Sequence, residues 1–127
     1  MLLNNELSIS FPEGFNEMSL EERKKLKLLA EGPGVCLSDP ERHMIVSIGW
    51  KPLGLLPRLI LNTNDIAAQT AKGISYQYDA EGVEMTGETL AVKNKKTLYY
   101  FHVYTRTALL EQNQTLWDTL LAEGRWV

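Results

Sequence analysis

Hydrophobic and polar residues alternate along several stretches of the chain in the way that predicts β-strands. Runs that alternate, or that are wholly apolar between turn residues, occur at residues 7–11, 35–37, 43–50, 74–78, 83–92 and 97–105. The strand at 43–50 places Met44, Val46, Ile48 and Trp50 on one face. The strand at 97–105 has large apolar side chains on both faces, which predicts a place in the middle of a sheet.

A helical period replaces this alternation in three other stretches. Residues 19–30 begin with Ser19 and Glu22, which fit a capping box. Residues 55–71 gather their apolar side chains within an arc of about 160°, and residues 108–123 do so within about 140°. Asn113 lies inside the last arc, so the C-terminal helix has two possible starts, at residue 108 or with Asn113 as its cap.

The order of these elements predicts one α+β domain over residues 1–127. Short polar links at residues 79–82 and 93–96 are of hairpin length, which indicates an antiparallel arrangement. We therefore expect a mostly antiparallel sheet of about five to six strands packed with three helices, similar to an α/β/α sandwich.

Three short phrases in the first half of the chain carry a family resemblance. They are Ile-Ser-Phe-Pro-Glu-Gly-Phe at residues 9–15, Ser-Leu-Glu-Glu at 19–22 and Ser-Asp-Pro-Glu at 38–41, the last leading into a strand. With the element order, they resemble the PsbP/Mog-like superfamily, which includes DcrB-type proteins. The resemblance implies an α/β/α sandwich and a non-enzymatic role: docking on a partner as an assembly factor, nucleotide-release factor or effector chaperone. It supplies no catalytic motif.

Composition narrows the class of protein further. The chain has 16 acidic and 13 basic residues, a net charge of −3, which argues against nucleic-acid binding. Its one cysteine excludes an internal disulfide framework. No apolar run reaches the roughly 18 residues of a membrane span, and residues 1–6 lack the basic start of a signal peptide. We expect a cytoplasmic protein without a cofactor.

Two clusters of reactive residues are candidates for a catalytic or a metal site. Cys36, Asp39 and His43 lie close in sequence and suggest a thiol nucleophile with a base. Cys36 sits in an apolar triplet, however, so we expect a buried, unreactive thiol. His43 and His102 would meet at a metal only if their strands paired, with Glu88 or Asp79 joining them, and no ligand spacing favours this.

Aromatic residues remain as the candidates for function. Most are expected in the core or in cross-strand pairs, and the others would form an exposed aromatic face suited to a partner. The candidate partner-binding residues are Trp50, Tyr76, Tyr78 and Tyr100.

These residues lead to two functional hypotheses. The first is a non-enzymatic protein-interaction module, such as an assembly factor, small chaperone or adaptor. Its partner would be another protein rather than nucleic acid or a membrane, and its oligomeric state is open, with a homodimer as one arrangement. The alternative is a small-ligand-binding or enzymatic domain with a site on the sheet face, built from His43, His102, Tyr100 and Cys36. A flat face favours the first hypothesis, and a deep pocket with convergent polar groups favours the second.

Overall fold

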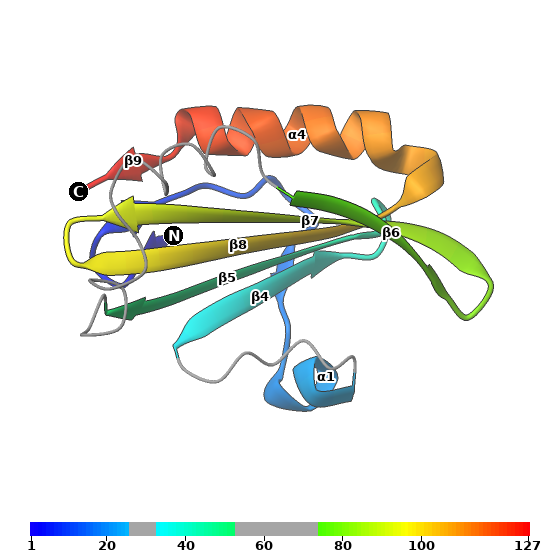
Figure 1. Ribbon diagram of the computed structural model, residues 1–127, viewed down its shortest axis with the longest axis horizontal. Coiled ribbons are helices and arrows are strands. Elements are labelled where there is room, and N and C mark those ends of the chain that lie inside the picture. The colour runs from blue at the N-terminus through cyan, green and yellow to red at the C-terminus, as the bar shows by residue number, and fades with distance from the viewer. Residues whose placement is uncertain (26–32, 53–73) are drawn as a thin grey trace.

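The computed structural model describes residues 1–25, 33–52 and 74–127, which form two antiparallel sheets and two helices (Figure 1). The larger sheet has six strands in the order β3-β4-β5-β8-β7-β6. These strands are β3 (Asn16–Glu17), β4 (Gly34–Asp39), β5 (Met44–Pro52), β6 (Ile74–Ala80), β7 (Val83–Asn94) and β8 (Thr97–Arg106). A small sheet combines β1 (Leu2–Leu3), β2 (Leu7–Ser8) and β9 (Arg125–Trp126). The helices are α1 (Leu20–Lys25) and α4 (Leu110–Glu123), and a 3₁₀ turn, η1 (Thr107–Leu109), precedes α4.

Strand β8 is interior, as its apolar residues predicted. It pairs with β5 on one side and with β7 on the other. Directly paired residues point to the same face, so a cross-strand row such as Ser47, His102 and Thr89 shares one side of the sheet. The register therefore assigns every side chain of the large sheet to one of two faces.

The face that we call inner is the one that α4 covers (Figure 1). On this face, buried side chains from β5 and β8 pack against others from α4 and the N-terminal segment. Together they form the core: Leu3, Leu7, Ile9, Met44, Val46, Ile48, Tyr99, Phe101, Val103, Trp117 and Leu120. The rings of Phe101 and Trp117 lie 5.9 Å apart between the two layers. The prediction that Met44, Val46 and Ile48 share a buried face is confirmed.

The helices of the described residues differ from the expectation in number. The described residues hold two helices rather than three, because the predicted helix at residues 55–71 lies outside them. Helix α1 starts with the predicted capping box: the Glu22 amide donates to Ser19 Oγ at 3.2 Å, and the Ser19 amide donates to Glu22 Oε1 at 3.3 Å. It follows β3 at one edge of the sheet (Figure 1), so in the described part of the chain a helical layer covers the inner face only.

Asn113 is not the cap of the last helix, because η1 leads the chain from β8 directly into α4. The residue is buried in the first turns of α4 and faces the sheet. Its side-chain amide donates to Thr105 Oγ1 and, at 2.9 Å, to the carbonyl of Arg42. A polar residue on the apolar stripe is tolerated because its donors are satisfied.

The predicted strand at residues 7–11 is shorter in the structure, where only Leu7 and Ser8 belong to a strand. Both pair with β1 on one side and β9 on the other. Neither helix in the described ranges has the length and apolar character needed to cross a bilayer.

Candidate docking surface

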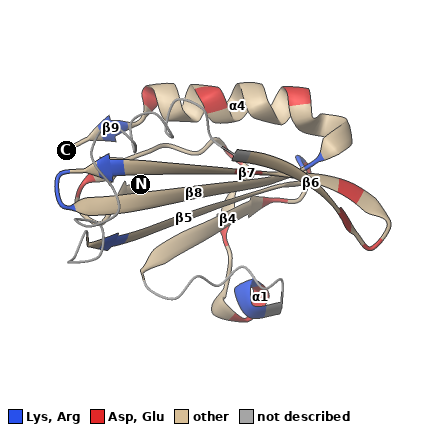
Figure 2. Cartoon of the chain, in the orientation of Figure 1, with Lys and Arg blue, Asp and Glu red and all other residues tan. Residues whose placement is uncertain are grey.

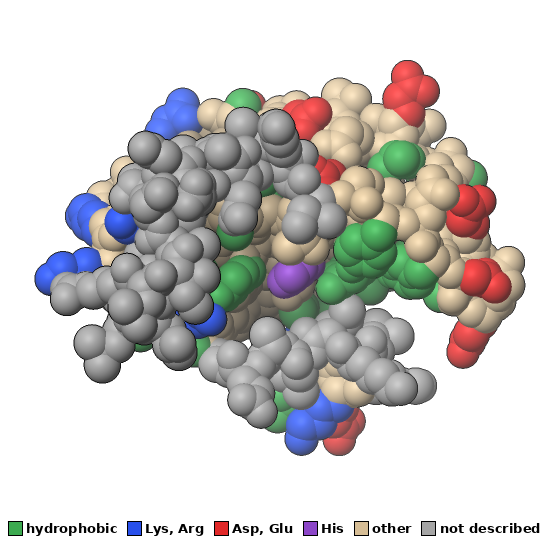
Figure 3. All heavy atoms as spheres, viewed as in Figure 1, with side chains coloured by type: hydrophobic (Ala, Val, Ile, Leu, Met, Phe, Trp, Pro, Cys, Tyr) green, Lys and Arg blue, Asp and Glu red, His purple; other side chains and the backbone are tan. Residues whose placement is uncertain are grey.

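The outer face of β6, β7 and β8 carries a group of tyrosines that we call the tyrosine surface: Tyr76, Tyr78 and Tyr104. The cross-strand rows Tyr76–Gly87–Tyr104 and Tyr78–Met85–Arg106 bring them together. Tyr76 is 42% exposed, and its ring centroid lies 5.9 Å from that of Tyr78. Figure 3 shows hydrophobic side chains gathered on this face toward the β6–β7 end, with acidic side chains beyond them.

Gly87 leaves the space that the Tyr76 ring occupies on the tyrosine surface. The Tyr76 ring lies directly over this glycine, and a methyl group at the Gly87 Cα would overlap the ring atoms. Glycine within a strand is typical of such a close approach by another group. An aromatic ring that covers a cross-strand glycine restores the contact area that the missing side chain would have given.

Two phenols of this group, those of Tyr78 and Tyr104, are held in their neutral form. Burial raises the pKa of Tyr104 to about 12, with further contributions from Tyr76, including a hydrogen bond, and from Tyr78 and Cys36. Burial, followed by the neighbouring Tyr76, also raises the pKa of Tyr78. The two groups therefore keep their hydroxyl protons at physiological pH, so they present apolar rings with polar, uncharged ends.

Next to the tyrosines, His102 is a neutral sheet histidine. Its Nδ1 lies 3.1 Å from Thr89 Oγ1, and its ring stacks on Tyr104 with centroids 6.4 Å apart and planes 17° apart. Burial lowers the pKa of His102, which favours the uncharged ring near neutral pH. The His102 ring therefore extends the tyrosine surface with another uncharged group.

The structure does not bring together the catalytic trio that the sequence suggests. Cys36 is buried and pairs with Ser47, whereas His43 lies in the β4–β5 turn with φ of 50°. Asp39 is three residues from Cys36 on the same strand, so it points to the opposite face. The two histidines are also separate, since His102 is opposite Ser47 and His43 precedes the first β5 pair. Within the described ranges, no group of His, Cys, Asp or Glu side chains is arranged to hold a metal.

The four candidate binding residues fall on two different faces. Tyr76 and Tyr78 are adjacent on the outer face, and Tyr100 lies on that face further along β8, where the Lys51 ammonium is 5.3 Å from its ring centroid. Trp50 lies on the inner face, because it pairs with Tyr99, and their rings are 6.2 Å apart. Sequence reasoning omitted Tyr104, although its even spacing from Tyr100 on one strand places both on one face.

An apolar pocket of about 320 Å³ opens beside Met85, where the tyrosine surface ends. We call it the His43 pocket; it is lined by Ser38, Asp39, Pro40, His43, Met44, Ile45, Val83, Met85 and Arg106. Its volume is at the lower end of the range for small-molecule sites. It has room for an apolar side chain from a protein partner.

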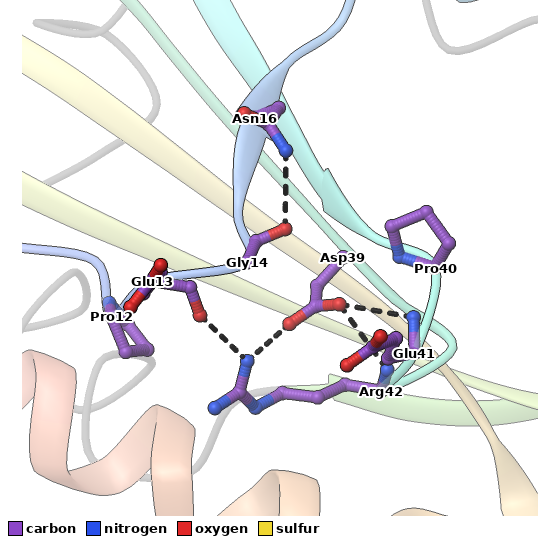
Figure 4. Close-up of a pocket in the computed structure, with 8 residues that line it drawn as sticks. All are labelled: Pro12, Glu13, Gly14, Asn16, Asp39, Pro40, Glu41 and Arg42. Atoms are coloured by element: carbon purple, nitrogen blue, oxygen red, sulfur yellow. Dashed lines mark hydrogen bonds and ion pairs between the residues drawn. The ribbon is translucent and has the colours of Figure 1, made fainter.

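A second, more open hollow of about 1040 Å³ lies around Arg42, between the β4–β5 turn and the N-terminal segment (Figure 4). The Arg42 guanidinium donates to the Asp39 carboxylate and, at 3.1 Å, to the Glu13 carbonyl. Burial acts to raise the pKa of Asp39, but hydrogen bonds from the Arg42 side chain and from the amides of Arg42 and Glu41 outweigh it and lower that pKa. These groups satisfy one another's hydrogen bonds, so the residues around the hollow hold the β4–β5 turn to the N-terminal segment.

Comparison with known proteins places the fold. No protein-family model matches the sequence, and no curated protein matches it. A crystal structure of a protein from Bacteroides thetaiotaomicron VPI-5482 is similar, with a TM-score of 0.62 and 10% identity over 95% of this chain. The chain spans 45% of that protein's length.

The solution structure of the cyanobacterial PsbP protein (CyanoP) from Synechocystis sp. PCC 6803 is also similar, with a TM-score of 0.55 and 14% identity. That similarity covers 95% of this chain and 86% of the other. The fold is PsbP-like. At such identities the similarity establishes the fold, and function has to be argued from the surfaces described above.

Proposed function

We propose that this chain is a non-enzymatic protein-interaction module of the assembly-factor or adaptor type, which binds its partner through the tyrosine surface. The observation that carries this proposal is the exposed Tyr76, held over Gly87 next to Tyr78 and Tyr104 on the outer face. Tyrosine offers a large contact area with few rotatable bonds, and it is enriched among residues that dominate binding energy.

The surroundings of the tyrosines support a protein partner. The neutral phenols of Tyr78 and Tyr104 need no compensating charge when a partner covers them. The His43 pocket offers a place for an apolar side chain beside them. The docking roles implied by the PsbP/Mog-like resemblance, DcrB-type proteins included, are of the same kind.

A native pull-down with mass spectrometry tests the proposal. We expect the wild-type chain to recover a stoichiometric protein partner, and the Tyr76→Ala/Tyr78→Ala double variant to lose it. A hot-spot tyrosine should contribute at least about 2 kcal/mol to the free energy of binding. Tyr76→Phe is the matched control, because it keeps the ring over Gly87 and should retain the partner.

Two results would contradict the proposal. One is undiminished capture of the partner by a double variant whose thermal unfolding is close to that of the wild type. The other is a turnover, found by substrate screening, that His43→Ala and His102→Ala abolish, because it would establish the enzymatic alternative.

A further inference from the structure

Strand β6 ends the six-stranded sheet and directs half of its backbone groups outward. The β6–β7 link is a two-residue turn, Glu81 and Gly82, with φ of 53° and 84°, which is the pattern of a type I′ hairpin. In such a hairpin the closing pair, Ala80 and Val83, exchanges both backbone hydrogen bonds, and every second pair after it does the same.

This alternation decides which residues of β6 have free backbone groups. Tyr78 and Tyr76 are two and four residues from Ala80 of the closing pair, so their amides and carbonyls point to β7. Ser75, Gln77 and Asp79 point theirs to the outer side. In the part of the chain that the structure describes, β6 has a strand partner on one side only, and these three residues are exposed.

Strand β6 lacks three of the devices that commonly prevent strand addition at an exposed edge. These are lysine, proline and a bulge. Residues 74–80 read Ile-Ser-Tyr-Gln-Tyr-Asp-Ala, without lysine or proline, and pair with β7 in an unbroken register. An incoming strand would therefore meet backbone groups in regular spacing.

The two sides of this edge differ in chemistry. Tyr76 and Tyr78 project from the outer face, whereas Asp79 lies on the other face, directly opposite Glu84. Residues 74–92 contain four acidic residues and no lysine or arginine. In Figure 2 the acidic residues of the β6–β7 hairpin lie at one end of the molecule, and basic residues gather at the opposite end.

We propose that the partner contributes an extended segment of alternating basic and apolar residues, which adds as a strand beside β6. This inference rests on the proposed function and specifies how the partner binds. Side chains of an added strand alternate between the faces, so its basic residues meet Asp79 and Glu84 while its apolar residues cover Tyr76 and Tyr78. Pairing of β6 with a second copy of itself is disfavoured, because the paired part of each β6–β7 hairpin, residues 74–89, carries acids and no bases.

The test uses a labelled synthetic peptide of alternating lysine and valine, as long as β6, and the full chain. A control peptide has the same composition, with the lysines in one block and the valines in another. We expect the alternating peptide to bind at least about tenfold more tightly by fluorescence anisotropy, and to slow amide hydrogen exchange at Ser75, Gln77 and Asp79.

Two variants at one position separate backbone pairing from side-chain contact. Gln77→Pro removes an outward amide and leaves the β6–β7 hydrogen bonds in place, whereas Gln77→Ala keeps that amide. We expect Gln77→Pro to weaken binding at least about tenfold relative to Gln77→Ala. If the proline unfolds β6, the Asp79→Asn/Glu84→Gln variant is used instead. It should weaken binding of the alternating peptide, and the loss should be larger at low salt than at high salt.

Several outcomes would overturn the inference. Equal binding of both peptides, or of Gln77→Pro and Gln77→Ala, would show charge attraction without strand pairing. If the chain dimerises and Gln77→Pro abolishes the dimer, the edge of β6 pairs with a second copy of the chain. In the pull-down, Gln77→Pro could retain the partner while Tyr76→Ala/Tyr78→Ala loses it. That result would rule out strand addition and leave the proposed function intact.

Discussion

Glu6 joins the N-terminal hairpin to the ends of β7 and β8. Its Oε1 accepts hydrogen bonds from Asn4 Nδ2 at 2.9 Å, Tyr99 OH at 3.0 Å and Thr97 Oγ1 at 3.2 Å. Its Oε2 accepts one from Asn94 Nδ2 at 3.0 Å. One carboxylate thus satisfies donors from three parts of the chain, including the hydroxyl of the fully buried Tyr99.

Truncation of Glu6 should therefore destabilise the fold. We expect Glu6→Ala to lower the free energy of unfolding by about 1–3 kcal/mol, because it leaves polar groups near Tyr99 without an acceptor. Urea denaturation measures the loss. Glu17→Ala, at an exposed position on β3, is the control and should change stability by less than about 0.5 kcal/mol. Equal effects of the two variants would contradict this role for Glu6.

Asp39 should make the stability of the protein dependent on pH. Its pKa is lowered in the folded state, so the unfolded chain binds the proton more readily. The stabilisation is fully present above the unfolded pKa of about 3.9 and is lost as the pH falls through the lower, folded-state pKa. We expect Asp39→Asn to be less stable at neutral pH and to lose this acid-dependent component, as measured by denaturation at a series of pH values. An acid dependence identical to that of the wild type would contradict the assignment; Asp79→Asn, at an exposed carboxylate, is the control.

Among the elements, β8 contributes side chains both to the core and to the outer face of the sheet. Its inner face supplies Tyr99, Phe101 and Val103 to the core, and its outer face supplies His102 and Tyr104 beside β6 and β7. A loss on the inner face should appear as lost stability, whereas a loss on the outer face should appear chiefly as lost binding.

Phe101→Ala tests this division. We expect it to cost about 3–5 kcal/mol in the free energy of unfolding, because the ring is buried against Trp117 and its removal leaves a cavity. Tyr100→Ala, one residue earlier and half-buried on the outer face, should cost clearly less in the same denaturation experiment. A cost below about 1 kcal/mol for Phe101→Ala would place that side chain outside the core.

The long strands could be predicted from the sequence because each shows its period over many residues. Strands β5, β7 and β8 match the expected stretches to within a few residues at their ends. Strands β1, β3 and β9 have two residues each, too few to show any period. Their positions depend on contacts between distant parts of the chain, such as the pairing of Leu7 with Trp126.

The candidate site could be predicted only in part, because it depends on register. Spacing alone correctly places Tyr76 and Tyr78 on one face, and places Trp50 with Met44. Whether Trp50 shares a face with Tyr100 depends on how β5 pairs with β8, and a shift of one residue would reverse the answer. The observed pairing of Trp50 with Tyr99 separates the two.

At the scale of the whole molecule, the two sheet faces and the two ends have different properties. The inner face is buried beneath α4, and the outer face carries the tyrosines (Figure 1). Acidic residues lie at the β6–β7 tip, and basic residues lie near the β7–β8 turn and β9 (Figure 2). A charged partner should therefore approach in one preferred orientation, more strongly at low salt.

Cys36 reports on opening of the molecule as a whole, since its side chain is 0% exposed on a strand that pairs on both sides. We expect a thiol reagent at neutral pH to label the native protein only as fast as the sheet opens, and to label it at once in denaturant. The exposed thiol of an Ala80→Cys/Cys36→Ala variant is the control for reagent speed. Immediate labelling of the native wild-type thiol would show that Cys36 is accessible and would revive the nucleophile hypothesis.

The three tryptophans have a spectroscopic consequence. Trp117 is buried against Phe101, and Trp50 and Trp126 flank Tyr99 with ring separations of 6.2 and 5.0 Å, so all three indoles lie on the side of the sheet that α4 covers. Their emission follows the integrity of that layer, while the tyrosine surface lies on the other side. Selective excitation of the indoles should thus be a clean probe of denaturation that is nearly blind to complex formation, so titrations with a partner need a dye or an isotope label on β6.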